Sequence, residues 1–237
     1  MKTIGLIGGM SWESSKVYYE YLNRRTQELL GGSHSSKNIM VTVDFAEIER
    51  WSFDGNWEAI GELMKESAQK LELAGADIIL LCTNTIHLVS DAITQNVNIP
   101  FIHIADATGE AIKAQNLKKV GLLGTAFTME KDFYTGYIRD KYDIEVIIPK
   151  AGDRQTVHKI IYDELVKGIF TEESRKKCME IIQRLSDAGA EGIILGCTEL
   201  PLLIPEASVD LPTFDTSRIH VYKAVDWALD RTAATMA

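Results

Sequence analysis

The sequence predicts an α/β protein of two similar lobes, each built on a doubly wound parallel sheet. Short apolar runs alternate with longer helical patterns along the 237-residue chain, and this alternation is typical of right-handed strand–helix–strand units. Several runs are apolar without interruption, such as Ile78–Leu81, which suits strands covered on both faces of a parallel sheet. Two segments of the first half also reappear in the second half, which predicts a duplication.

Apolar runs are expected to form the strands, with helices between them. The expected strands are Thr3–Ile7, Asn38–Val43, Asp77–Cys82, Ile99–Ile102, Lys119–Leu123, Ile144–Ile148, Gly192–Gly196 and Pro212–Phe214. The clearest helical patterns are Ser14–Leu30, Trp57–Leu73, Met129–Arg139 and Glu172–Ala188. No linker separates the lobes. We expect a first lobe at 1–102, completed by a C-terminal helix at 216–237, and a second lobe at 103–215.

Charge and composition indicate a small-molecule protein of the cytoplasm. The net charge is −9 and no basic block is present, which argues against nucleic acid or an anionic membrane as partner. The apolar start breaks at Gly8 and is too short for a signal peptide, and no run approaches the roughly 18 residues of a membrane span. The three cysteines are widely spaced, which predicts reduced thiols in a cytoplasm.

The internal repeat consists of two matched pairs of segments. Ile4–Gly8 resembles Val120–Gly124, and Ala74–Asp77 resembles Ala188–Glu191. Each member of the second pair leads into an apolar strand that ends in Cys-Thr. The shared order and the similar offset favour duplication over convergent packing.

Two alignments of the repeat compete at the end of that strand. An offset of 114 residues places Thr83 opposite Cys197, whereas a shift by one residue places Cys82 there. The choice matters because adjacent strand residues point to opposite faces of a sheet. Composition leaves both alignments open.

Polar segments follow three of the expected strands. They are Gly8–Ser11, Thr83–Thr85 and Cys197–Glu199. Ligands of doubly wound sheets bind beyond the carboxyl ends of the strands, and the amides of a following helix suit a carboxylate or phosphate. The glycines lack the spacing of a nucleotide fingerprint. The alternative for Ser11 and Thr85 is a role as helix caps.

Cys197 is the strongest candidate for chemistry. At a helix N-terminus its thiolate is expected to be stabilised and its pKa lowered, which makes a usable base or nucleophile. The alternative is a small buried apolar residue. Cys82, at the end of a buried strand, and Cys178, inside a helix, are expected to serve packing.

These residues resemble a known family. Thr83–His87 together with Gly196–Glu199 is similar to the two signature motifs of the aspartate/glutamate racemase superfamily, and Gly8–Ser14 resembles the opening motif of its aspartate racemase branch. The resemblance implies two α/β lobes with the active site in the cleft between them, and chemistry that needs no metal or pyridoxal cofactor. The first motif of that family normally reads Cys-Asn-Thr-x-His, so the catalytic positions carried over are Thr83 and Cys197.

The resemblance implies a one-sided racemase. Racemisation needs a base on one face of the α-carbon and a proton donor on the other, and a hydroxyl is a far weaker acid than a thiol. In relatives that the chain resembles, the second-half cysteine acts on the L-enantiomer. We therefore expect Cys197 to deprotonate L-substrates readily, while the Thr83 side is slow.

The remaining site residues are expected to bind an acidic amino acid. Arg50 is the candidate for the side-chain carboxylate, although it could instead balance its acidic neighbours in solvent, and Lys167 is a weaker candidate. His87 is expected to cap or orient, and His103 to lie in the interior. The α-carboxylate is expected at the amides of Asn84, Thr85, Thr198 and Glu199, with Met10 and Ser11 closing the pocket.

Other functions remain compatible with the sequence. A sibling of the maleate isomerase or arylmalonate decarboxylase type would act on a dicarboxylate, and a two-lobed binding protein would have no activity. The sequence does not separate aspartate from glutamate. A homodimer is expected from the frequency of dimers among soluble proteins.

Overall fold

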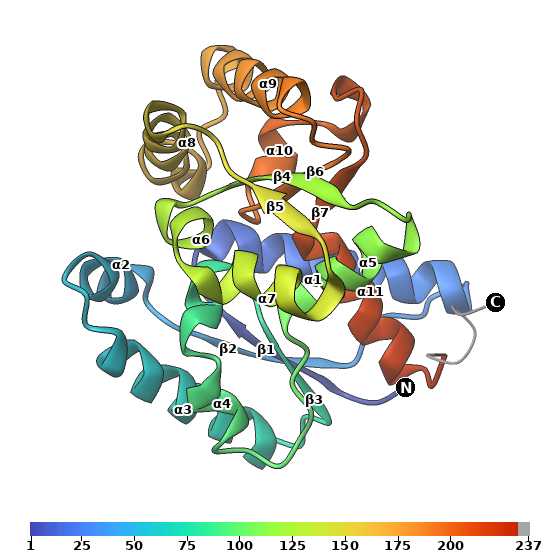
Figure 1. The fold of residues 1–237 in the computed structure, drawn as a ribbon. Coiled ribbons are helices and arrows are strands. Elements are labelled where there is room, and N and C mark those ends of the chain that lie inside the picture. The colour runs from blue at the N-terminus through green and yellow to red at the C-terminus, as the bar shows by residue number, and fades with distance from the viewer. Residues whose placement is uncertain (232–237) are drawn as a thin grey trace. The chain divides into compact units, whose positions relative to one another are not determined.

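The computed structural model describes residues 1–231. The chain divides into two compact units (Figure 1). The first contains Met1–Ile104 and the described residues from Ser217 onward, and the second contains Ala105–Thr216. Positions 232–237 of the helix expected at 216–237 lie outside the described residues.

The first unit contains a parallel sheet with the strand order β2-β1-β3. Helix α3 packs against β1 and β2, and Figure 1 shows α1 on the other side of this sheet. The strands are β1 (Ile4–Gly8), β2 (Asn38–Thr42) and β3 (Ile78–Leu81). The helices are α1 (Trp12–Leu30), α2 (Phe45–Phe53), α3 (Trp57–Leu73), α4 (Asp91–Thr94), the 3-10 helix η1 (Thr85–Val89) and α11 (Thr216–Ala228).

Helix α3 shows why the first unit folds as it does. Its residues Ile60, Met64, Ala68 and Leu71 recur at helical spacing, so one stripe of the helix is apolar. All four are buried, in one cluster with residues of β1 and β3. Asn56 begins the helix by accepting a hydrogen bond from the Ala59 amide, as an N-cap residue does.

The second unit contains a parallel sheet with the order β5-β4-β6-β7. In Figure 1, α8 and α9 lie on one side of β4 and β6, and α7 lies on the other. The strands are β4 (Lys119–Gly124), β5 (Glu145–Ile147), β6 (Ile193–Gly196) and β7 (Thr213–Asp215). The helices are α5 (Ile104–Ala114), α6 (Ala126–Glu130), α7 (Asp132–Tyr142), α8 (Ala151–Asp163), η2 (Leu165–Lys167), α9 (Glu172–Asp187), α10 (Leu200–Leu203) and η3 (Glu206–Ser208).

The two parallel sheets confirm the predicted fold class. Cys178 on α9 packs with residues of α8 and β6 in one apolar cluster, so its predicted packing role is confirmed. Among the described residues, no helix combines the length and the apolar character that crossing a membrane requires.

Two predicted elements were wrong. The expected strand Ile99–Ile102 forms only an isolated bridge between Phe101 and Ile79, because Pro100 has no N–H with which to extend a ladder. The expected helix Met129–Arg139 is divided between α6 and α7. Lys131 is extended there, with φ −91° and ψ 143°, and so breaks the helical hydrogen bonding.

The strand pairing decides between the two alignments of the repeat. Gly5 of β1 pairs with Ile79, and the matching Gly121 of β4 pairs with Ile193. Ile79 and Ile193 are thus equivalent, which gives the offset of 114 residues. Thr83, and not Cys82, therefore occupies the position of Cys197 in the first unit.

Candidate active site

The first strand end brings the opening motif beside the segment that carries Thr83. Ile7 of β1 pairs with Leu81 of β3, and the Cys82 amide donates to the Ile7 carbonyl at 2.9 Å. The Ser14 hydroxyl lies 2.9 Å from the Ser11 carbonyl and 3.2 Å from the Cys82 carbonyl. Ser14, which the sequence reasoning did not select, therefore connects the start of α1 to the end of β3.

Met10 and Ser11 both have structural roles. Ser11 is the N-cap of α1, and its hydroxyl oxygen accepts from the Ser14 amide at 3.4 Å, so the capping role considered for it is confirmed. Met10 is buried in the apolar cluster of the first unit. The peptide bond between the two residues is cis.

Both backbone groups of Thr83 are held. Its amide donates to the Leu81 carbonyl at 2.9 Å, and its carbonyl lies 2.7 Å from Nδ1 of His87. Thr83 and Thr85 are each 8% exposed and Asn84 is 3% exposed. A small surface of each residue therefore remains open at the carboxyl end of β3.

Three histidines surround this strand end. His87 and His220 are buried, whereas His103, which was expected in the interior, is only half-buried. His87 lies 4.6 Å from the ring of His103 and 5.9 Å from the ring of His220, measured between ring centroids. Nε2 of His220 lies 2.8 Å from the Ile102 carbonyl, and its Nδ1 lies 2.8 Å from the Tyr18 hydroxyl. Burial is the largest cause that lowers the pKa of His87 well below its usual value and the pKa of His220 to about 3.

The second strand end joins a thiol to a carboxylate. The Cys197 thiol donates to Oε2 of Glu199 at 3.0 Å, and the Thr198 hydroxyl donates to the same oxygen at 2.8 Å. Glu199 is 2% exposed. A carboxylate is acceptor-only when ionised, so the contact keeps the proton on the sulfur in this state.

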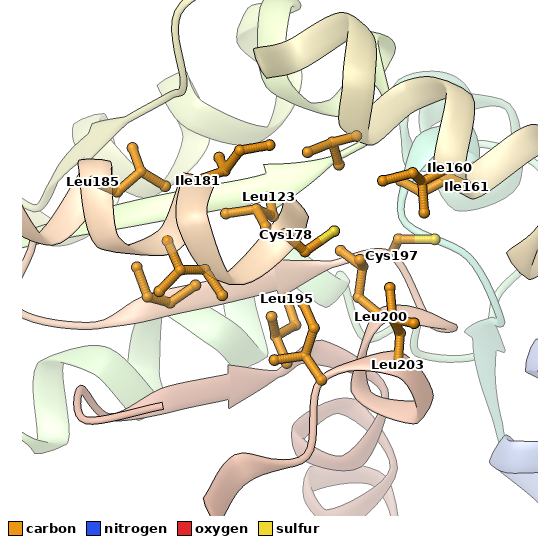
Figure 2. Packing of buried hydrophobic residues seen from close by; sticks show 14 of the residues in the cluster. Leu123, Ile160, Ile161, Cys178, Ile181, Leu185, Leu195, Cys197, Leu200 and Leu203 are labelled. Atoms are coloured by element: carbon orange, nitrogen blue, oxygen red, sulfur yellow. The ribbon is translucent and has the colours of Figure 1, made fainter. Parts of the chain in front are cut away.

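The pKa expected for Cys197 was wrong in direction. Burial, the nearby Glu199 charge and the hydrogen bond to its carboxylate raise the thiol pKa well above its usual value, while the amides of Glu199 and Leu200 lower it by less. Figure 2 shows Cys197 in the apolar cluster that contains Ile161 and Leu200. Since α10 has four residues, its dipole is too short to outweigh this desolvation.

Glu199 is a functional candidate that sequence reasoning missed. It was considered only for its amide, and that amide faces the Cys197 sulfur. The available signal was a carboxylate two residues after a candidate nucleophilic cysteine. Such an acid on the next turn can reach the thiol and hold its proton.

A third polar group adjoins the second strand end. Gly124 of β4 pairs with Gly196 of β6, so Thr125 follows β4 where Cys197 follows β6. The Thr125 oxygen caps α6 by accepting from the Thr128 amide. Nδ1 of the half-buried His158 accepts from the Ala126 amide at 3.2 Å, which fixes the start of α6.

The two candidate cations lie on the surface of their units. Arg50 is exposed in the last turn of α2, where its guanidinium lies 5.9 Å from the ring of Trp51. Among residues 1–231, Arg50 forms no ion pair, so balance with Glu47 and Glu49 is not seen. Lys167 is exposed at the end of η2.

All three cysteines are free thiols. Burial raises the pKa of the Cys82 thiol well above its usual value, and Cys82 is fully buried, as expected of a packing residue. Within the described part of the chain, no cluster of histidine, cysteine or carboxylate groups is arranged to hold a metal ion.

One known protein family matches almost the whole chain. The sequence model described as Asp/Glu/Hydantoin racemase matches residues 7–224, which include both strand ends. The chain belongs to this family. The membership confirms the resemblance inferred from the three motifs, and it places the chain among isomerases.

Individual relatives agree with the racemase family. The broad specificity amino-acid racemase RacX of Bacillus subtilis is 24% identical, over 90% of this chain and 92% of its own. A candidate Asp/Glu racemase from Yersinia pestis has a solved structure with TM-score 0.89 and 47% identity, covering 97% of this chain and all of its own. The solved structure of an aspartate racemase homologue from Pyrococcus horikoshii has TM-score 0.84 and 34% identity, and it also covers 97% of this chain and all of its own.

The state of the Cys197 thiol predicts how it reacts with iodoacetamide. Alkylation should be slow near neutral pH and should rise only in alkaline solution, because the raised pKa keeps the thiol protonated. Glu199→Gln should move the rise to lower pH, because it removes a negative charge beside the sulfur. Mass spectrometry of the peptide that contains Cys197 measures the rate at each pH.

The matched control for this measurement is Glu206→Gln, which changes an exposed carboxylate of the same unit and should leave the profile in place. A Glu199→Gln profile that stays in place or moves to higher pH would contradict the assigned contact.

The buried histidines predict a loss of stability in mild acid. A histidine that stays neutral when folded binds a proton only in the unfolded state below about pH 6.5, so stability falls as the pH falls. For His220 the loss should continue to about pH 3. Between pH 7 and pH 5 each such histidine costs about 2 kcal/mol of unfolding free energy.

Urea unfolding at the two pH values tests this. His220→Asn should lose about 2 kcal/mol less than the parent between pH 7 and pH 5, whatever its stability at pH 7. His34→Gln, which changes an exposed histidine, should behave like the parent. An equal loss in the parent and in His220→Asn would disprove the neutral state of His220.

Proposed function

We propose that the chain is a cofactor-independent racemase of acidic amino acids in which Cys197 acts on the L-enantiomer and Thr83 acts from the opposite face. The carrying observation is the strand pairing, which makes Thr83 and Cys197 equivalent positions of two repeated units. Racemisation requires such a pair of groups, one for each face of the α-carbon. Family membership adds the reaction class.

Acidic substrates are supported by the relatives and by the residues. The Yersinia protein carries the Asp/Glu description and the Pyrococcus protein the aspartate description. In the proposed complex the α-carboxylate binds at Asn84, Thr85 and Thr198, and Met10 and Ser11 close the pocket. Arg50 binds the side-chain carboxylate: its guanidinium has no ion-pair partner in residues 1–231 and suits bidentate recognition.

Glu199 supplies the activation that Cys197 needs. The thiol rests in its protonated form, 3.0 Å from the carboxylate oxygen. When substrate binds, the S–H proton passes to Glu199, and the thiolate then takes the proton from Cα. The electron pair left on Cα delocalises into the α-carboxylate. The amides of Glu199 and Leu200 stabilise the thiolate while it exists.

The opposite face completes the inversion. The Thr83 hydroxyl gives a proton to Cα and regains one from water, while Glu199 releases its proton to solvent. The hydroxyl is a far weaker acid than a thiol, so its basic form is hardly populated, and reaction from the D-enantiomer starts slowly. The enzyme is therefore biased toward L-substrates.

Heavy-water exchange tests the proposal. L-aspartate and L-glutamate should lose their α-proton to deuterium faster than the D-enantiomers, as followed by proton NMR. Loss of the α-proton at equal rates from both enantiomers would contradict the bias. Exchange on neither amino acid, with turnover of an unsaturated or malonic diacid, would instead indicate a sibling activity, and binding without exchange would indicate a ligand-binding protein.

Substitutions at the two strand ends should separate the two faces. Cys197→Ala should abolish exchange, because it removes the base, and Thr83→Cys should raise the rate from the D-enantiomer, because it adds a second thiol. Cys178→Ala removes a packing cysteine and serves as the control, with exchange retained. If Cys197→Ala still exchanged at the parent rate, the assignment of the base would be wrong.

A further inference from the structure

His87 is a buried side chain near the site that the proposed chemistry does not use. It lies in η1 with 2% of its surface exposed, and both ring nitrogens are engaged. Nδ1 lies 2.7 Å from the Thr83 carbonyl, and Nε2 lies 3.1 Å from the Ile104 amide nitrogen. One imidazole therefore joins the end of β3 to the start of α5.

These contacts determine the tautomer of His87. A backbone N–H can only donate, so Nε2 must accept from Ile104 and carries no proton. Nδ1 must then carry the proton and donate to the Thr83 carbonyl. Burial also disfavours the charged ring, whose pKa lies well below its usual value. The neutral Nδ1–H form is therefore the one that fits both neighbours.

The ring is itself fixed by its surroundings. His103 and His220 both lie against it, and Nε2 of His220 contacts the Ile102 carbonyl at 2.8 Å. His87 and His220 thus bind the backbone on either side of His103. As a result, the segment Ile102–Ile104 is held to η1 and to α11, and His87 has a rigid base from which to hold Thr83.

The Thr83 backbone is anchored on two sides. Its amide donates to the Leu81 carbonyl in a tight turn, and its carbonyl accepts from Nδ1 of His87. Because the groups on both sides of the Thr83 Cα are held, the Cα–Cβ bond has a set direction, and a threonine side chain has few rotamers about it. Release of the carbonyl by His87 would let the Cα shift, and the hydroxyl would shift with it.

We propose that His87 is a positioning residue: by holding the Thr83 carbonyl, it keeps the Thr83 hydroxyl directed at the substrate face opposite Cys197. This assignment rests on the proposed racemase function. It predicts that a defect at His87 slows inversion more than exchange with retention, because exchange with retention uses Cys197 on one face and inversion needs both faces.

Two conservative variants separate the two hydrogen bonds of His87. The amide of asparagine lies near the position of Nδ1 and can still donate to the Thr83 carbonyl. The amide of glutamine lies near the position of Nε2, so it can accept from the Ile104 amide but does not reach the Thr83 carbonyl. L-aspartate in heavy water reports both rates: deuterated L-aspartate measures exchange, and deuterated D-aspartate measures inversion. Thermal unfolding of each variant reports the structural cost.

In His87→Gln the ratio of inversion to exchange should fall about ten- to a hundredfold, the scale of a misplaced reacting group. His87→Asn should keep a ratio close to that of the parent, even if both variants unfold at similar temperatures. The surface substitution His34→Gln is the control. Equal ratios in both His87 variants, or a lower ratio in His87→Asn, would overturn the assignment.

The outcome differs if the proposed function itself fails. The parent protein would then show neither exchange nor inversion on acidic amino acids, which rejects both proposals together. Where a His87 variant does not fold, nitrogen NMR of the parent decides: His87 should show the Nδ1–H tautomer across the neutral pH range. An Nε2–H tautomer or a charged ring would reject the proposed hold on Thr83.

Discussion

Close approach of neighbouring backbones at the strand ends determines where the reactive residues lie. A Cβ added to Gly124 would lie 2.9 Å from the Gly196 carbonyl oxygen, and one added to Gly196 would lie 2.9 Å from the Leu123 carbonyl oxygen. In the first unit a Cβ on Gly9, whose φ is +96°, would lie 2.2 Å from the Val43 carbonyl oxygen. Only glycine permits these approaches. These glycines therefore permit the observed register, in which Cys197 directly follows β6.

That register has an electrostatic consequence. Cys197 enters an apolar cluster with Glu199 beside it, so the resting thiol is protonated and the carboxylate is the nearby acceptor of its proton. The equivalent strand end of the first unit carries the hydroxyl of Thr83, and His87 contacts the carbonyl of the same residue. Two repeated units thus offer groups of very different acidity, and the proposed bias toward L-substrates follows from this difference.

Much of this arrangement could be predicted from the sequence, because buried strands and repeated motifs can be recognised in short stretches of residues. The apolar runs predicted the parallel sheets, and the family motif selected Thr83 before the strand pairing made it equivalent to Cys197. What failed depended on context. Pro100 ended a strand that its neighbours favoured, Lys131 divided a helical pattern, and burial with Glu199 reversed the expected pKa shift of a thiol.

The central claim is that Thr83 and Cys197 act on opposite faces of one α-carbon. A crystal structure of Cys197→Ala with L-aspartate tests it most directly, because the variant binds substrate without consuming it. The account predicts that Cα lies within about 4 Å, the contact distance of heavy atoms, of two groups on opposite sides: the Thr83 hydroxyl and the methyl group that the substitution leaves in place of the thiol. Aspartate bound elsewhere, or contacting both residues through the same face, would contradict the account.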